Sequence, residues 1–286
     1  MNGRRMSAVE WSLLLALAAA WGGIFLLNRF VLDGFPPLTA VFLRVALAAP
    51  LLLAVVHLGG ERLPRSLGAW SAFAVMGFLN NALPFTLFVW AQQSITSGLA
   101  AIINATTPFF TALLAHLLTR DERLAPGKLA GLLLGLAGVI VLIGPGVLGG
   151  LGRAVVAELV LLLAPVSYAF AGLWGRRFRP PSSSVAACGM VLMSTVMMAP
   201  VAALHDHPWT LAPSMRAWSA VAAQAAVGTA LAYWLYFRIL RTAGATNLLL
   251  VTLLMPPAAM LLGALILGER FGWSAFAGLG FIFLGL

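Results

Sequence analysis

The sequence contains little charge. Asp, Glu, Lys and Arg make up 9% of its 286 residues, whereas apolar types make up 62%. An ordinary soluble domain is about 25% charged and about 45–50% apolar. At this length a soluble fold has too little core volume to bury so much hydrocarbon. The composition therefore predicts a protein whose main solvent is lipid.

Cysteine is nearly absent, and common catalytic motifs are missing. The single Cys188 excludes a disulfide framework and a cysteine-based metal site. His205 and His207 flank Asp206, but two histidines without a further ligand are more typical of a solvated loop. The sequence has no HExxH or GxSxG motif, and an integral-membrane enzyme would need convergent catalytic groups near one membrane face. We therefore expect no enzyme, no cofactor and no metal site.

Acidic side chains are missing from the middle of the apolar runs. Proton-coupled carriers usually keep an Asp, Glu or His within the membrane, and here only His116, near the end of a run, comes close. This disfavours obligate proton antiport through a buried carboxylate. The eight acids lie at run ends or in connections: Glu10, Asp33, Glu61, Asp121, Glu122, Glu158, Asp206 and Glu269.

Long apolar runs dominate the chain. Gly, Pro and charged residues separate them, and a membrane span takes about 20 residues, so ten spans use roughly 200 and leave no room for a soluble catalytic domain. Continuous runs disfavour a β-barrel, whose segments alternate. We predict an all-α integral membrane protein with ten transmembrane helices. The runs centre near residues 19, 48, 80, 107, 137, 167, 195, 227, 255 and 279.

The cations predict the orientation of these spans. With a cytoplasmic N-terminus, inside connections carry 12 of the 17 Lys and Arg residues, outside connections carry 4, and Arg44 lies within a run. Both termini are then cytoplasmic. Nucleic-acid binding is disfavoured because the cations are scattered over short connections and do not form one solvated face. The inside cations are Arg4, Arg5, Arg62, Arg65, Arg120, Arg123, Lys128, Arg176, Arg177, Arg179, Arg238 and Arg241.

An internal repeat divides the ten runs into two sets of five. A shift of 148 residues aligns Glu10 with Glu158, Arg29 with Arg177, Pro108 with Pro256, and the Ala-Trp-Ser-Ala motif at 69–72 with that at 217–220. Because five is odd, the second set must enter the membrane from the opposite side. The sequence therefore predicts two inverted repeats, residues 1–148 and 149–286, as in many carriers.

Several motifs resemble one transporter family. They are Trp21-Gly22-Gly23, Phe42-Leu43-Arg44, Asp121-Glu122-Arg123 after Pro108, and Gly268-Glu269-Arg270 after Pro256. The pattern resembles the drug/metabolite transporter superfamily in its ten-helix EamA-type branch, and within it bacterial YddG-type amino-acid exporters. The resemblance implies alternating access in a bacterial inner membrane and export of amino acids, aromatic ones included, or related small metabolites.

Polar and aromatic residues deep in the runs form a candidate substrate site. Asn81 and Phe85 share a helix face, and the 148-residue shift places them on Thr229 and Tyr233. Such pairs converge at a repeat axis. Hydrogen-bonded helix packing remains the alternative for Asn and Thr, and core packing the alternative for the aromatics. The predicted substrate-binding residues are Trp21, Asn81, Phe85, Asn104, Tyr168, Thr229, Tyr233 and Tyr236.

Arg44 is the one charge well inside a run, about seven residues from its predicted outer start. An unpaired guanidinium is costly there, so it should face protein or water. It could capture a substrate carboxylate. It could equally donate to carbonyl groups or extend its head toward the outer surface, and the sequence leaves these alternatives open.

Prolines and glycines are candidates for moving and packing positions. Pro50 and Pro200 lie at matched places in the two halves, as do Pro108 and Pro256, and each can be a hinge or a static kink. Small residues permit close helix packing, either inside one chain or between two, so the chain can be a monomer or a homodimer. The glycines concerned are Gly131, Gly135, Gly138, Gly278 and Gly280.

These observations favour a carrier that moves a small molecule across a lipid bilayer. Export of amino acids and related metabolites is the leading prediction. Export of drugs or nucleotide sugars is the alternative, an integral-membrane enzyme is a weaker one, and a channel is disfavoured by the kinked inverted repeats. The last run ends at Leu286, so we expect a short final span, with a basic cytoplasmic tail either removed or never present.

Overall fold

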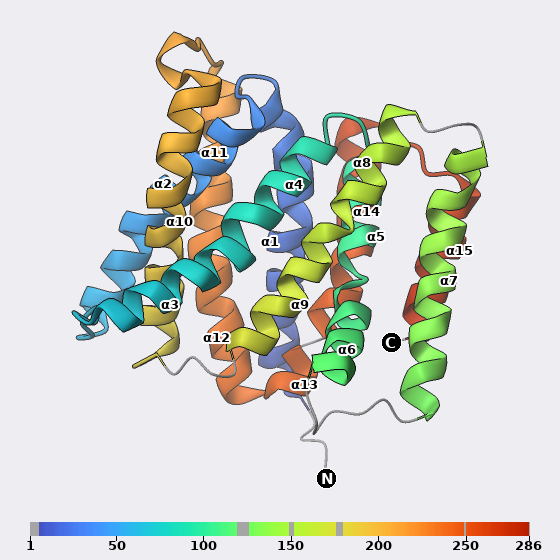
Figure 1. The fold of residues 1–286 in the computed structure, drawn as a ribbon, viewed down its shortest axis with the longest axis horizontal. Coiled ribbons are helices and arrows are strands. Elements are labelled where there is room, and N and C mark those ends of the chain that lie inside the picture. The colour runs from blue at the N-terminus through green and yellow to red at the C-terminus, as the bar shows by residue number, and fades with distance from the viewer. Residues whose placement is uncertain (1–5, 119–125, 149–151, 176–179, 249, 286) are drawn as a thin grey trace.

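The computed structural model describes residues 6–118, 126–148, 152–175, 180–248 and 250–285. These residues form helices joined by short connections and contain no β-strand (Figure 1). Each predicted apolar run coincides with a helical segment. The motif Asp121-Glu122-Arg123 and the cations at 176, 177 and 179 lie outside the described residues.

Several apolar runs contain more than one helical element, so the elements outnumber the runs. The first half contains α1 (Ala8–Leu32), α2 (Pro37–Leu58), α3 (Leu67–Gly77), η1 (Phe78–Ala82), α4 (Leu83–Ala91), α5 (Ser97–Asn104), α6 (Thr107–Leu118) and α7 (Pro126–Leu148). The second contains α8 (Arg153–Leu161), α9 (Leu163–Gly175), α10 (Ser183–Asp206), η2 (Pro208–Thr210), α11 (Met215–Ala225), η3 (Ala226–Leu231), α12 (Ala232–Thr242), α13 (Ala245–Leu248), α14 (Leu250–Leu267) and α15 (Trp273–Gly285).

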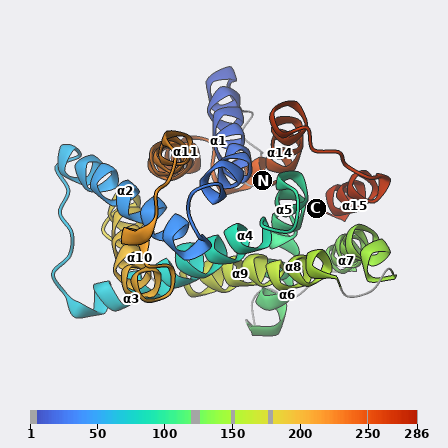
Figure 2. The ribbon, with the colours of Figure 1, turned by 90° about the horizontal axis from the view of Figure 1, so that it is seen from above.

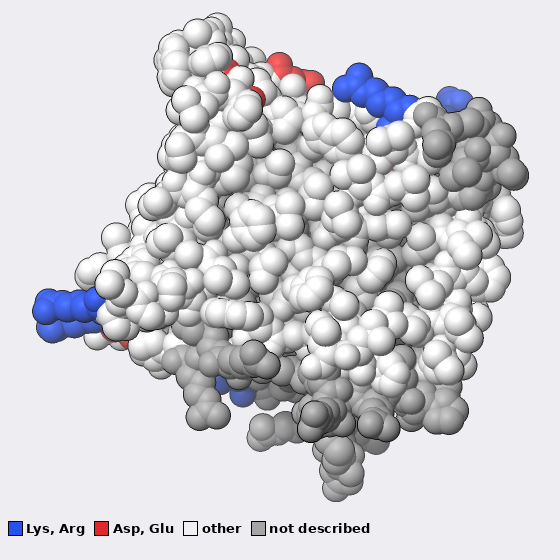
Figure 3. Space-filling view, viewed as in Figure 1, with Lys and Arg blue, Asp and Glu red and all other residues white. Residues whose placement is uncertain are grey.

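Eight helical stretches of the described residues are long and apolar enough to cross a membrane. Two shorter apolar helices, Leu129–Ile143 and Trp273–Gly285, accompany them. On the face that Figure 3 shows, charged side chains gather along the upper edge and at the lower left, and the broad middle is uncharged. Such a surface suits contact with lipid tails. The prediction of an all-helical chain with membrane-length helices is confirmed.

Acidic side chains tie helix ends together across the sequence. Asp206, the last residue of α10, accepts hydrogen bonds from the backbone N–H (2.7 Å) and the hydroxyl (3.0 Å) of Thr39, in the first turn of α2. Glu61, just after α2, accepts from the hydroxyl of Ser182, the N-cap of α10, at 2.8 Å. Carboxylates stabilise helix N-termini, where N–H groups lack partners. The antiparallel pair α2–α10 is thus linked at both ends.

The helices pack in pairs around two hydrophobic cores. Helix α1 packs against α14, α6 against α9, α2 against α10, and α7 against α15. From above, α7 and α15 lie at one edge, and α2, α3 and α10 lie at the opposite edge (Figure 2). Between them stand α1, α4, α5 and α9. This middle group carries most of the deep aromatic residues singled out above.

Glycines bring α7 and α15 into backbone contact. A Cβ atom added at Gly138 would lie 2.7 Å from the carbonyl oxygen of Gly278, and one added at Gly131 would collide with the carbonyl oxygen of Gly285. Gly135 faces the ring of Phe109, whereas Gly280 has nothing within 4 Å of such an atom. The small-residue stripe therefore packs inside the chain, with Gly280 as the exception.

Gly138→Val should lower the melting temperature of the purified protein, because its side chain meets backbone atoms that cannot rotate away. Overpacking of this kind costs about 1–3 kcal/mol. Gly280→Val is the matched control, since it adds the same side chain to open space. Thermal unfolding in detergent measures both, and equal melting temperatures for the two variants would show that α7 and α15 do not pack this closely.

Candidate functional site

Two π-helical turns interrupt the third and eighth apolar runs at matching places. The 148-residue shift carries Phe78, where η1 begins, onto Ala226, where η3 begins. In η1 the Leu83 N–H bonds to Phe78 O, and at the end of η3 the Ala232 N–H bonds to Val227 O; each backbone bond spans five residues. π-Helical turns inside α-helices often mark functional sites.

Neighbouring helices satisfy backbone groups around η1. The Ser167 hydroxyl on α9 donates to Leu79 O at 2.8 Å, and the Ser194 hydroxyl on α10 lies 3.1 Å from Gly77 O. Carbonyls freed by an irregular turn need such partners when no water can reach them. The distortion is therefore stabilised by the surrounding bundle.

The two π turns each hold one buried polar side chain, and each is bound by a side chain from the other half of the protein. Asn81 on η1 accepts a hydrogen bond from the Tyr233 hydroxyl at 3.1 Å. Thr229 on η3 accepts one from Arg44 Nε, also at 3.1 Å. Asn81 and Thr229 are 0% and 1% exposed. Asn81 and Thr229, which the repeat shift relates, are thus each hydrogen-bonded to a side chain of the opposite half.

Both polar atoms of the Asn81 side chain bond to other side chains of the protein. Its amide nitrogen donates to the Ser194 hydroxyl at 3.1 Å, while its carbonyl oxygen receives Tyr233. Ser194 in turn lies 2.7 Å from the Met190 carbonyl oxygen. The prediction that Asn81 and Thr229 contact substrate directly stays a prediction, and their geometry shows them holding Tyr233 and Arg44 in place.

Aromatic rings gather beside these polar groups. Trp21 lies 5.8 Å from Tyr236 between ring centroids, and Tyr168 stacks on Phe88 at 6.4 Å. The Phe85 ring lies under the Arg44 guanidinium, 3.7 Å from its central carbon to the ring centroid. Both ring separations lie in the range of about 4.5–7 Å at which aromatic pairs attract each other. We name Arg44, Phe85, Tyr168, Tyr233, Tyr236 and Trp21 the central cluster.

Asn104 is the predicted site residue that no recorded contact joins to the central cluster. It ends α5, where the fourth run breaks before α6 begins at Thr107. Among the described residues, its Oδ1 is the only fully buried side-chain nitrogen or oxygen without a hydrogen-bond partner. Its role as a substrate ligand stays a prediction.

The four predicted hinge prolines occupy different helical positions. Pro50, Pro200 and Pro256 lie inside α2, α10 and α14, where each removes an intrahelical hydrogen bond. Pro108 lies in the first turn of α6, where a missing N–H costs nothing. The fourth run is therefore split just before its proline, whereas α14 continues through Pro256.

A buried amide network, which the sequence analysis missed, lies above this region. The Gln224 side chain donates to Asn28 Oδ1 at 2.6 Å, and Asn28 Nδ2 donates to Gln92 Oε1 at 2.5 Å. Gln92 Nε2 donates to Phe25 O at 2.7 Å. All three amide residues are at most 1% exposed. Their repeat positions hold Leu, Met and Arg, so comparison of the halves could not reveal the network.

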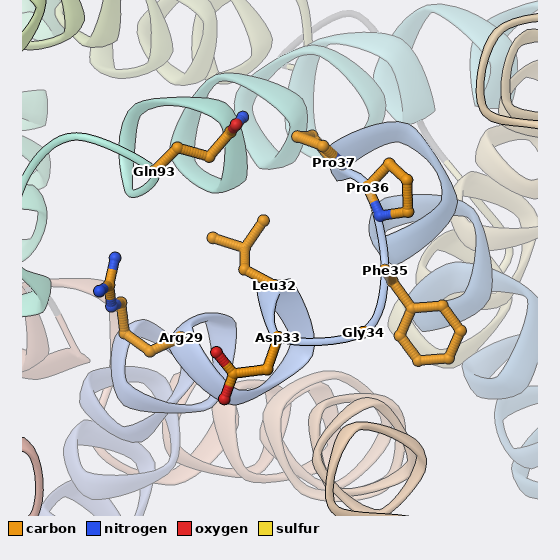
Figure 4. A pocket seen from close by; sticks show the side chains of 8 residues that line it. All are labelled: Arg29, Leu32, Asp33, Gly34, Phe35, Pro36, Pro37 and Gln93. Atoms are coloured by element: carbon orange, nitrogen blue, oxygen red, sulfur yellow. The ribbon is translucent and has the colours of Figure 1, made fainter. Parts of the chain in front are cut away.

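A surface depression of about 530 Å³ lies over this network, lined among others by Arg29, Asp33 and Gln93 (Figure 4). A second depression of about 440 Å³ shares Arg29 and Gln93 and adds Glu158 and Glu269. Arg29 Nη1 donates to Gln92 O at 2.6 Å, which links the depression to the amide network. The buried amide network and the two charged depressions thus meet at Arg29 and at the neighbouring residues Gln92 and Gln93.

The comparisons with known proteins identify the family. The description "EamA-like transporter family" matches residues 10–144 and again residues 155–286. The chain is 28% identical to the inner membrane transporter YedA of Escherichia coli K12, over 94% of this chain and 86% of the relative. It is also 28% identical to a protein of the same strain named "Probable amino-acid metabolite efflux pump", over 98% of this chain and 94% of that relative.

One solved crystal structure shares the fold, with a TM-score of 0.68 at 21% identity over 98% of this chain and 96% of that one. The named relatives are transporters or efflux pumps. With its two family matches covering both halves, the chain belongs to the EamA-like transporter family of the drug/metabolite transporters.

Proposed function

We propose that this protein is a bacterial inner-membrane carrier that exports amino acids, aromatic ones included, and related small metabolites by alternating access. The name of the amino-acid metabolite efflux pump supports this substrate class. So does the narrower resemblance to YddG-type exporters. The observation that carries the proposal is the pair of reciprocal hydrogen bonds at the matched π turns, which assemble one central cluster from both halves.

Two inverted five-helix repeats account for the packing. Under the repeat shift, α1 corresponds to α8–α9 and α14 to α5–α6, so the pairs α1–α14 and α6–α9 are equivalent. The pairs α2–α10 and α7–α15 each join a helix to its own mate. The two family matches fall on the two repeats. In Figure 1, α15 runs back toward the side where α1 begins, which suits an even number of crossings.

Within the site, we assign two kinds of role. Trp21, Tyr168, Tyr233 and Tyr236 present rings that suit an apolar or aromatic substrate body. Asn81 and Thr229 are positioning residues, since they are buried and hold Tyr233 and Arg44. The kinks at Pro50, Pro200 and Pro256 and the break before Pro108 are the points at which helix halves pivot.

The amide network closes one end of this site. With both termini cytoplasmic, Asn28, Gln92 and Gln224 lie on the periplasmic side, so this structure represents a state closed to the outside. Opening must break several buried hydrogen bonds together. Because the network has no repeat mate, the cytoplasmic end closes by different contacts.

Counterflow in proteoliposomes tests the proposal. Purified protein should exchange a labelled amino acid from a panel against the same unlabelled compound, with and without a pH gradient. We expect exchange without the gradient, because among the described residues no carboxylate lies in the central cluster. Exchange of drugs or nucleotide sugars but no amino acid would contradict the proposed substrate class, and single-channel currents would contradict a carrier.

Gln92→Leu should open the outer side. It leaves Asn28 Nδ2 without its acceptor and removes one donor from Phe25 O, at about 1–3 kcal/mol per buried group, which shifts the closed state by about tenfold. The reporter is Trp21→Cys in a Cys188→Ser background, labelled from outside by an impermeant maleimide. Labelling should be about tenfold faster. Gln93→Leu is the matched control, because Gln93 is exposed and its side chain does not bond to the network. Equal labelling rates for both variants would exclude the network as a gate.

A further inference from the structure

Arg44 carries a buried charge for which the described part of the chain supplies no counter-charge. Its side chain is 5% exposed, in the interior of α2. The described carboxylates are engaged elsewhere: those of Glu61, Asp206 and Glu269 bind helix N-termini. Glu10 closes a capping box, and Asp33 and Glu158 line the surface depressions. No carboxylate of the described residues bonds to Arg44.

The guanidinium is held on one edge and one face. Nε donates to the Thr229 hydroxyl, and the ring of Phe85 lies against the guanidinium plane at 3.7 Å. The terminal nitrogens Nη1 and Nη2 make no recorded hydrogen bond. Among the described residues, Asn104 Oδ1 is the only sealed and unpartnered side-chain nitrogen or oxygen, so the two Arg44 nitrogens are not completely sealed. The fork therefore keeps hydrogen-bond donors that no group of the described residues uses.

The alternatives for this arginine do not fit its geometry. Arg29 donates to a backbone carbonyl, Gln92 O, whereas Arg44 has no such acceptor among the described residues. Arg216 lies over the Phe30 ring at 4.0 Å but is exposed at a helix end, whereas Arg44 is buried. Arg44 therefore neither donates to backbone carbonyls nor extends its guanidinium toward the surface.

The groups around the fork are neutral and aromatic. Tyr168 and Tyr233 are close enough to interact with the Arg44 charge. Tyr168 stacks on Phe88, and Tyr233 is directed to Asn81. A planar guanidinium fork matches a carboxylate in two parallel hydrogen bonds, and a low-dielectric surrounding strengthens that pair.

We propose that Arg44 is the carboxylate-binding residue of the transport site, and that substrates are small molecules with a carboxylate beside an aromatic or apolar body. The inference rests on the proposed function and narrows it. Thr229 and Phe85 act as positioning groups that fix the orientation of the fork. Molecules that lack the carboxylate leave the guanidinium without an anion and bind poorly.

Four probes with one ring test this inference: 3-phenylpropionate and L-phenylalanine, which carry a carboxylate, and L-phenylalaninamide and phenethylamine, which do not. Binding is read as the rise in melting temperature of the full-length detergent-purified protein, titrated to give an apparent Kd. Wild type should bind the carboxylates at least about tenfold more tightly than the other two, as expected for a charge-assisted pair. Arg44→Gln should abolish this difference, Arg44→Lys should retain part of it, and Arg216→Gln should leave it unchanged.

The outcomes separate this inference from the carrier proposal. If Arg44→Gln loses the preference for carboxylates, the assignment of Arg44 is supported. If, in addition, no probe shows counterflow, only the proposed transport function is contradicted. Counterflow of the amide or amine at rates equal to the carboxylates overturns the assignment of Arg44 and leaves the carrier intact. Equal binding of all four probes, or no binding of any, also overturns it. If Arg44→Gln does not fold, the preference of wild type and of Arg44→Lys decides.

Discussion

Glu269→Ala should lower the melting temperature of the protein by on the order of 5 °C, from the loss of about 2–3 kcal/mol. Glu269 Oε1 accepts from the Ser97 N–H at 2.8 Å and Oε2 from the Gly98 N–H at 3.2 Å. These donors open α5, and the N-cap Thr96 serves only the Leu99 N–H. Without the carboxylate, two N–H groups at a partly buried helix start lose their partners.

The position of Glu269 depends on the turn before it. Gly268 adopts φ +66°, which favours glycine, and the Glu269 N–H then bonds back to Gly263 O at 3.1 Å. A Cβ atom at Gly263 would collide with the carboxylate. The Gly268-Glu269-Arg270 motif is therefore a device that joins the end of α14 to the start of α5.

Glu10→Ala is the matched control for Glu269→Ala. Glu10 also accepts from a backbone N–H, that of Ser7 at 2.8 Å, but at an exposed helix start. Water replaces the lost partner there, so its melting temperature should change by no more than about 2–3 °C. Equal changes for both variants would mean that Glu269 is an ordinary surface cap.

Tyr233→Phe should lower the rate of amino-acid counterflow at least tenfold while the folded yield stays within about twofold of wild type. The change removes only the hydroxyl that donates to Asn81, which leaves a buried Asn81 Oδ1 unsatisfied and the ring free to shift. A displacement of about 1 Å in a binding site can cost 10²-fold in rate. Counterflow and size-exclusion yield on the same preparations measure both quantities.

Trp234→Phe is the control for this change. Trp234 is the next residue along α12 but is 46% exposed, so its loss should leave counterflow unchanged. A folded yield that falls in proportion to activity in Tyr233→Phe would assign Tyr233 to packing, and the site would then have to rest on other residues.

Much of the fold could be predicted because an apolar run long enough to cross a lipid bilayer must form a helix there. The ten run centres coincide with helical segments, and the shift of 148 residues also relates the two π turns that the structure contains. The π turns themselves were not predictable. Their sequences, such as Phe78–Ala82, contain no proline, and an extra residue per turn leaves no trace in an apolar composition.

The sequence suggests candidate site residues, which stay a prediction, but not the hydrogen bonds between them. Asn81, Thr229 and Tyr233 stand out as polar groups deep in apolar runs. The pairing of Thr229 with Arg44 and of Asn81 with Tyr233 does not stand out, because these bonds span 185 and 152 positions of the sequence. The Asn28–Gln92–Gln224 network was missed for a related reason: it joins three helices and has no repeat mate that would mark it.

Counterflow of labelled L-phenylalanine by wild type, Asn81→Leu, Tyr233→Phe and the double variant tests the central claim most directly. If the two side chains act as one unit of a substrate site, each single change should lower the rate at least about tenfold, and the double variant should be no slower than the worse single. Wild-type rates in both single variants, or losses that multiply in the double variant, would contradict the account.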